Sequence, residues 1–341
     1  MEDNNIPDRY LINDIRTQPE FRGITFSKYK KSEVKKQFIQ NMLNGKIEPA
    51  CYWCAELVCA GHYAEIWEDI LYYVGKYIHI GNPKIVIYLE KRYEMFRYIV
   101  ESNSYLAELS LRNNPKIRTL FAEVISIITL SVKHNSFEKV KINREEEFDI
   151  TQMSERFKAP SVEFAQPIFH PKDPKELLIP INEFSYHISG TKKNMLSACY
   201  WIEWIVEFDI ICKKRKTPIS CKRRAVDVDI KFQCDIIWMI WDSLLYYVNE
   251  LNNPYIDSLI RSLKNIFCIK YTNSSCKKRK YLLYFAVELL TTNVPTNIEL
   301  IQNKQIVSNV IEKINEIYVQ IKENEESPNM DYLFLGLKDN F

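Results

Sequence analysis

The sequence predicts an all-α protein with two related multi-helix modules, an extended connector between them and a C-terminal amphipathic helix. Apolar residues recur at the spacing of an amphipathic helix, as in the stripe formed by Trp67, Ile70, Leu71, Val74 and Ile78. Apart from the weak stretch "VEFAQPIF", no run alternates apolar and polar residues as a half-buried strand does. A repeated set of sequence blocks is the evidence for two modules.

Three short blocks rich in aromatic residues occur twice, in the same order. "ACYW" at 50–53 returns 148 residues later, "WEDILYYV" at 67–74 returns as "WDSLLYYV" 174 residues later, and "NPKI" at 82–85 returns as "NPYI" 171 residues later. Blocks of uncommon residues rarely repeat in order by chance, so they indicate an internal duplication. The offset grows between the first and second blocks, and the second copy therefore carries an insertion there.

Helix boundaries follow from the apolar stripes and from the prolines and glycines between them. Pro49 suits the first turn of a helix that ends near Gly61, and Pro83 and Pro254 suit the starts of two corresponding helices. The predicted helices of the first module span 32–44, 49–60, 64–79, 84–101 and 116–132. The predicted helices of the second module lie near 193–212, 227–250, 255–270 and 278–292.

The predicted organisation has six parts. An N-terminal arm, the first module, an acidic and proline-rich connector, the second module, the amphipathic helix and a tail are expected at 1–23, 24–140, 141–190, 191–295, 296–324 and 325–341. Five prolines between Pro160 and Pro180 argue against a long helix in the connector. Apolar residues repeat every seven positions from Leu300 to Ile321, so this helix either docks on the second module or joins a partner helix.

Composition limits the classes of protein to which this chain can belong. Of its 341 residues, 46% are hydrophobic and 26% are charged, which is a globular balance. The net charge of +2 means that attraction to a polyanion must come from local patches. No apolar run reaches the ~18 residues of a membrane-spanning helix, so we expect no membrane insertion. Nine cysteines and a polar, acidic N-terminus without a secretory signal predict reduced thiols in a cytosol-like compartment.

The stretch "ACYWCAELVCAGH" has the spacing of a zinc motif, with Cys51, Cys54, Cys59 and His62 as its four ligands. On one helix the first and last of these residues would be about 16 Å apart, whereas zinc ligands lie within about 2.3 Å of the metal. The second copy keeps only Cys199 and has Ile, Glu and Ile at the other three positions. We therefore expect packing residues here, with no metal and no cofactor.

Other signs of catalysis are weak in this sequence. It contains no G-x-S-x-G, no H-E-x-x-H and no papain-like cysteine motif, and no two of its seven glycines form the G-x-G of a phosphate-binding loop. Of the five histidines, only His62 and His79 are expected to approach each other. Glu68 and Asp69 fall on a predicted exposed helix face, where solvation explains them. We therefore expect a protein that is not an enzyme and has no catalytic residue.

Two basic runs are the candidate polyanion-binding site, because clustered Lys and Arg side chains contact phosphate without reading sequence. The first lies in the insertion of the second copy, and the second follows about fifty residues later. The candidate residues are Lys213, Lys214, Arg215, Lys216, Lys222, Arg223, Arg224, Lys277, Lys278, Arg279 and Lys280. A solvated loop and a nuclear-import signal are the alternative interpretations.

An apolar cluster in the tail is the candidate protein-docking site. Its members follow a polar spacer and are Tyr332, Leu333, Phe334, Leu335, Leu337 and Phe341. Leaving so many large apolar groups in water is unfavourable, by ~1.5–3 kcal/mol for each that could be fully buried. The cluster is therefore expected to dock, either on its own chain or on a partner or second copy.

The blocks "ACYWCAELVCAGH", "KYIHIGNPKI", "ACYWIEWIVEFDIICKK" and "KKRKYLLYFAVELL" resemble a helical family of nucleocytoplasmic large DNA viruses, especially the mimivirus-like giant viruses. The resemblance covers roughly residues 24–292 and carries over no catalytic residue. It implies a structural or interaction protein, a scaffold or adaptor, in the viral factory of the host cytoplasm or in the virion. The expected partners are other viral proteins or a second copy. The alternative is an accessory factor that binds DNA or RNA in replication, transcription or packaging.

Overall fold

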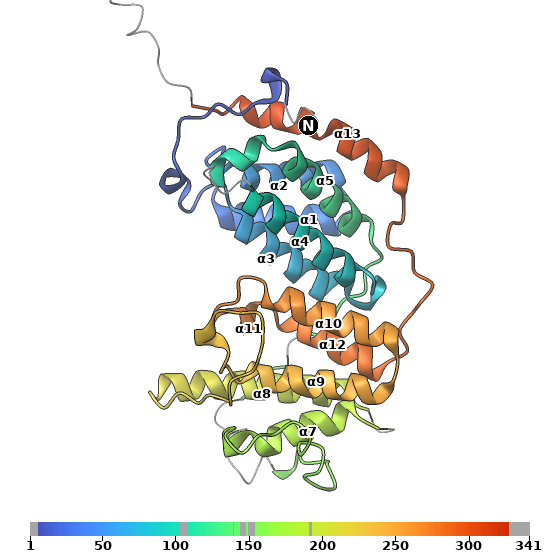
Figure 1. The fold of residues 1–341 in the computed structure, drawn as a ribbon. Helices are drawn as coiled ribbons and strands as arrows, with labels where there is room; N and C mark the ends of the chain where they lie inside the picture. The colour runs from blue at the N-terminus through green and yellow to red at the C-terminus, as the bar shows by residue number, and fades with distance from the viewer. Residues whose placement is uncertain are drawn as a thin grey trace, which may run out of the picture. The chain divides into compact units, whose positions relative to one another are not determined.

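The computed structural model describes residues 6–102, 108–138, 140–143, 148, 154–190 and 193–326. Within these ranges the chain forms twelve α-helices and no β-strand beyond one isolated bridge, which confirms the predicted all-α class (Figure 1). None of the described helices is both long enough and apolar enough to cross a membrane. The observed helices of the first predicted module start and end within two residues of most predicted boundaries.

The chain divides into two compact units, and each contains segments that are distant in sequence. Unit 1 consists of Met1–Asp69, Arg92–Leu130 and Ile301–Phe341, and unit 2 consists of Ile70–Lys91 and Ser131–Leu300. The predicted modules were continuous in sequence, so this division differs from them. The largest difference is at the end of the chain, which follows the second module in sequence but belongs to unit 1.

Unit 1 is built on α1 (Lys31–Leu43), α2 (Ile47–Cys59) and α5 (Pro115–Leu130), which pack against one another. Two further helices, α3 (Tyr63–Tyr73) and α4 (Ile85–Ser102), each contribute one part to this unit. An aromatic cluster forms its core. The ring of Trp67 lies 5.1 Å from Tyr93 and 5.8 Å from both Phe96 and Phe121, measured between ring centroids.

The C-terminal amphipathic helix, α13 (Lys304–Lys322), covers α5 and α2 of unit 1. Its apolar face buries Val307, Ile314, Ile317, Tyr318 and Ile321. The predicted docking on the second module is therefore wrong. The physical reason is the complementary surface that unit 1 offers. The guanidinium of Arg118 on α5 stacks 3.8 Å from the Tyr318 ring centroid and donates to the Asn315 side chain at 2.9 Å.

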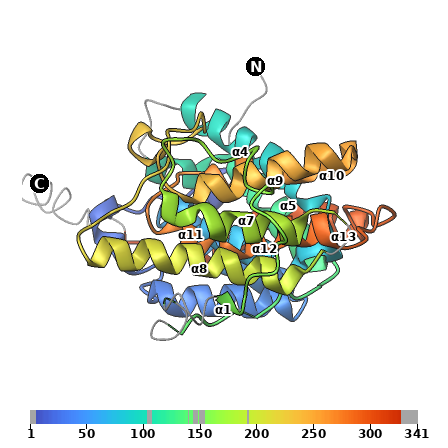
Figure 2. The same cartoon turned by 90° about the horizontal axis from the view of Figure 1, so that it is seen from below.

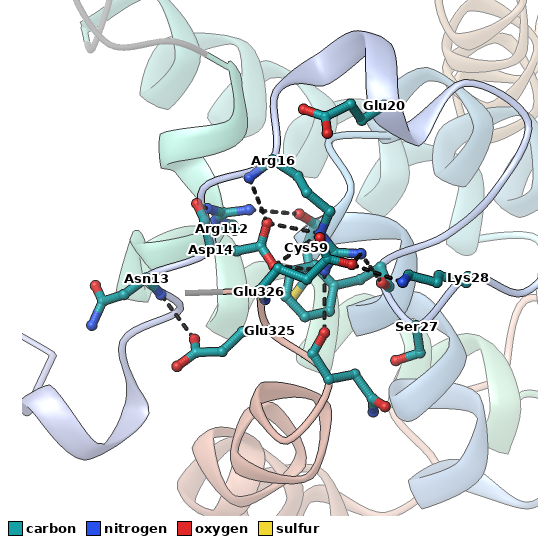
Figure 3. A network of polar contacts seen from close by, with 12 residues as sticks. Asn13, Asp14, Arg16, Glu20, Ser27, Lys28, Cys59, Arg112, Glu325 and Glu326 are labelled. Atoms are coloured by element: carbon teal, nitrogen blue, oxygen red, sulfur yellow. Dashed lines mark hydrogen bonds and ion pairs between the residues drawn. The ribbon is translucent and has the colours of Figure 1, made fainter. Parts of the chain in front are cut away.

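The N-terminal arm and the residues after α13 are joined by a polar network that we call the clamp (Figure 3). The carboxylate of Asp14 accepts hydrogen bonds from the guanidinium of Arg16 and, at 2.7 Å, from the backbone N–H of Glu326. The N–H of Ile15 donates to the carbonyl of Glu326 at 3.0 Å, and the ammonium of Lys28 lies 2.7 Å from the Glu326 carboxylate. Burial acts to raise the pKa of Asp14, but these hydrogen bonds outweigh it and lower that pKa. The clamp thus fixes the backbone at residue 326.

Unit 2 is organised around α12 (Lys280–Thr291), whose residues 281–290 are all buried. This helix packs against α8 (Met195–Lys214), α9 (Ile237–Leu251) and α10 (Pro254–Cys268). A further helix, α7 (Leu178–Ile188), lies along α8 in both views (Figure 1, Figure 2). The short helix α11 (Ser275–Lys278) precedes α12.

Two boundaries in unit 2 differ from the predictions. The connector predicted for 141–190 ends in α7, which contains Pro180. A proline is tolerated there because it lies in the first helical turn, where backbone N–H groups have no intrahelical partner. The helix predicted for 227–250 begins only at Ile237, after a loop and one turn of 3₁₀-helix at Ile230–Phe232. The insertion of the second copy therefore extends further than the repeat offsets indicated.

The packing within each unit follows the order of the repeated blocks. In unit 1, α1 packs on α2 and α2 on α5, and in unit 2, α7 packs on α8 and α8 on α12. Trp67 contacts Phe96 at 5.8 Å, and Trp241, its counterpart in the second block, contacts Phe267 at 5.3 Å. The two phenylalanines are separated by the same 171 residues as the NPKI and NPYI blocks. These contacts agree with a duplication, and the superposition of the two modules stays a prediction.

Candidate polyanion-binding surface

The first basic run forms the exposed C-terminal end of α8. A helix C-terminus carries partial negative charge, so cations are favourable in its last turn. Lys213 donates to Asp209, one turn earlier, at 2.6 Å. Lys214, Arg215 and Lys216 are exposed, and the left-handed φ of 59° at Lys216 ends the helix.

The fold brings the second basic run close to the first. Lys213 lies near Cys276 on α11, and its charge acts to lower the pKa of that thiol, although burial dominates and raises the thiol pKa to about 12. The hydroxyl of Tyr271 joins the two elements, because it donates to Asp235 of the insertion at 3.0 Å and contacts the sulfur of Cys276 at 2.8 Å. The next two residues after Cys276 are the exposed Lys277 and Lys278. Cations more than sixty residues apart in sequence therefore share one region of unit 2.

Arg224 does not belong to the exposed set. Its guanidinium donates to both carboxylate oxygens of Asp173, at 2.7 and 2.8 Å, and to Asp242 at 2.7 Å. Burial acts to lower the pKa of Arg224, but these two carboxylates outweigh it and raise the pKa. The backbone N–H of Lys222 also donates to Asp173. Arg224 thus attaches the insertion to the preceding connector and to α9, so it is not available to an external anion.

Two members of the second run also face the interior. The side chain of Arg279 is buried and donates to the carbonyl of Phe267 at 2.5 Å. Lys280 is half-buried and lies 3.4 Å from the carboxylate of Glu203. The candidate set therefore narrows to the exposed cations, which we call the basic surface: Lys213, Lys214, Arg215, Lys216, Lys222, Arg223, Lys277 and Lys278.

No protein-family model, curated protein or solved structure matches this chain. The placement of its own side chains is therefore the basis for a functional assignment. The six candidate docking residues of the tail, between Tyr332 and Phe341, lie outside the described residues.

The cysteine-rich stretch forms the buried part of α2. Burial raises the pKa of the Cys51 thiol to about 12 and raises those of Cys54 and Cys59, so these thiols stay protonated at neutral pH. The Nε2 atom of His62 is already within 2.7 Å of the Ile24 carbonyl oxygen. In the described part of the chain, no group of three or more His, Cys, Asp or Glu side chains is arranged to hold a metal ion. The geometry suits packing.

One expectation for acidic residues needs correction. Asp69 was expected on an exposed face, but it is buried and forms an ion pair with Lys35 of α1. Burial raises the pKa of Asp69, and the ammonium of Lys35 partly opposes this change. The periodicity of α3 could not show this, because α1 covers the residue and the partner lies in a different helix.

A buried histidine–glutamate pair in unit 2 had no signal in the sequence. His79 is fully buried, forms an ion pair with Glu288 of α12, and stacks 4.7 Å from the ring centroid of Phe285. His134, which is half-exposed, lies 3.4 Å from the same carboxylate. His79 follows a π-helical turn, Val74–Ile78, and has a left-handed φ of 48°. Its histidine neighbour is thus His134, which sequence reasoning did not consider.

Proposed function

We propose that this chain is a non-enzymatic adaptor or scaffold protein of a large DNA virus that binds nucleic acid through the basic surface. The observation that carries the proposal is the convergence of two exposed basic runs at the end of α8 and on α11. Phosphate contacts by Lys and Arg provide most of the affinity of sequence-independent nucleic-acid binding. The resemblance in the aromatic blocks supports the viral setting, with action in the viral factory or the virion.

The support beneath the basic surface favours a binding role over that of a mobile charged loop. The insertion carries Lys222 and Arg223 and is held at one point by Arg224, between Asp173 and Asp242. At a second point it is held by the hydrogen bond from Tyr271 to Asp235. Because the backbone is attached at both points, less conformational freedom is lost when a polyanion binds.

The test compares two variants that lose the same charge at different places. The first replaces Lys214, Lys216, Lys277 and Lys278 of the basic surface with Gln. The control replaces four exposed lysines of unit 1 with Gln: Lys30, Lys36, Lys46 and Lys116. Binding to fluorescent single- and double-stranded DNA and to RNA is followed by anisotropy between about 50 and 200 mM salt.

We expect the first variant to bind more weakly and to show a smaller salt dependence, with a slope reduced by up to ~0.9 for each lost phosphate contact on duplex DNA. The control variant should bind as the wild type does. An equal loss in both variants would show that binding follows overall charge and not this surface. No salt-sensitive binding by the wild type would refute the nucleic-acid proposal itself.

A further inference from the structure

The clamp sets the position from which the tail leaves unit 1. The backbone of Glu326 is bonded on both sides, through its N–H to Asp14 and through its carbonyl to Ile15, and its side chain lies 2.7 Å from Lys28 (Figure 3). The neighbouring Glu325 accepts from the backbone N–H of Asn13 at 3.0 Å. Residues 327–341 therefore start from a fixed point beside the N-terminal arm.

Exposed apolar side chains lie directly beside this point. The side chain of Ile15 is 54% exposed, and the side chain of Tyr29, the residue after Lys28, is 43% exposed. The ring of Tyr29 meets the half-buried Trp53 edge-to-face at 5.4 Å, and Trp53 meets Tyr52 in the same way at 5.2 Å. We call Ile15, Tyr29, Tyr52 and Trp53 the apolar patch. Large aromatic side chains that remain partly in water are typical of a surface that a partner covers.

We propose that residues 332–341 of the same chain dock on the apolar patch. The segment is rich in apolar groups, and only five residues separate its start from Glu326. An extended chain of this length spans about 20 Å, so the patch is within its reach. Asp331 and Asp339 give the segment acidic groups, which complement the exposed Lys28 and Lys30 beside Tyr29.

The same chain is favoured over a second copy by effective concentration. A segment attached by a short flexible linker experiences its site at an effective concentration on the order of millimolar. A second copy would have to reach a similar concentration in solution to compete. The clamp strengthens this preference, because it holds the start of the segment near its site.

The experiment places a photo-cross-linking residue in the full-length chain. p-Benzoylphenylalanine replaces Phe334 in the apolar segment or, as a control, Asn329 in the polar spacer. After irradiation, mass spectrometry maps the cross-links, and a mixture of isotopically light and heavy protein separates links within one chain from links between copies. We expect the Phe334 probe to link within one chain to peptides containing Ile15, Tyr29 or Trp53.

Two matched double variants test the patch itself. Ile15→Ser with Tyr29→Ser removes two exposed patch residues, whereas Met95→Ser with Tyr98→Ser removes an equally exposed pair on α4. The first pair should lower the cross-link yield about tenfold or more, as expected for the loss of apolar burial, and the second should leave it unchanged. The proposal is wrong if links form elsewhere, form only between copies, do not exceed those of the Asn329 probe, or are insensitive to the patch variant.

Discussion

Arg223 and Arg224 are adjacent and carry the same charge, yet their environments differ. Arg223 is exposed and donates to the side chain of Gln233, whereas Arg224 is buried between Asp173 and Asp242. A sequence shows both as members of one basic run. Their different roles depend on two carboxylates that lie 51 and 18 residues away.

Replacing Arg224 with Met should destabilise the protein far more than replacing Arg223 with Met. Removing the guanidinium leaves the buried Asp173 carboxylate without its charge partner, and breaking such a buried pair costs about 3–5 kcal/mol. The change at Arg223 should stay within about 0.5 kcal/mol, as surface substitutions usually do. Urea denaturation at neutral pH measures both. Equal effects would contradict the buried role of Arg224.

His187 on α7 is a second residue whose burial predicts a measurable property. Its ring is buried, and among the described residues neither of its nitrogens has a hydrogen-bond partner. Burial lowers the pKa of His187 to about 4. The unfolded chain takes up a proton near pH 6.5, which the folded chain resists, so this stabilising contribution is complete above pH 6.5 and decreases as the pH falls towards 4.

Replacing His187 with Phe should therefore reduce the acid sensitivity of the fold. Between pH 6.5 and 4 the wild type should lose up to ~1.4 kcal/mol of stability per pH unit through this residue, and the variant should lack that part of the slope. Urea denaturation across this pH range provides the measurement. Parallel slopes for the two proteins would mean that His187 is protonated in the folded state.

At the scale of elements, the local patterns located most helices, but not the surfaces that they cover. The heptad spacing in α13 identified its apolar face, and Val307, Ile314, Ile317 and Ile321 are indeed buried. The spacing could not show that this face packs on α5 and α2. Two helices of unit 1 compose that surface, and both lie far from α13 in sequence.

The position of α13 leads to a prediction for its buried face. Ile317→Ala should destabilise the protein by about 2–5 kcal/mol, because Ile317 is 6% exposed and a cavity would remain. Ile306 of the same helix is 38% exposed, so Ile306→Ala is the matched control and should cost much less. Thermal or urea unfolding compares them. Similar losses at the two sites would argue that α13 is not docked as described.

At the scale of the whole molecule, sequence order and unit membership differ. Unit 1 contains both the first and the last described segments, and the clamp joins them through residues about 310 positions apart. Unit 2 begins within α3, at Ile70, and resumes at Ser131. A duplication read along the sequence predicts two consecutive modules, whereas the contacts assign α13 to the helices of the first copy.

The sequence by itself determined the all-α class, the position of most helices and the two basic runs. These features depend on apolar periodicity, on proline and glycine and on charge, all of which are local. Only the tertiary structure decided that Arg224 and Arg279 are buried, that Asp69 pairs with Lys35, and that His79 pairs with Glu288. It also decided where α13 docks. The physical reason is that burial and ion pairing depend on residues distant in sequence, and no local pattern specifies which of them meet.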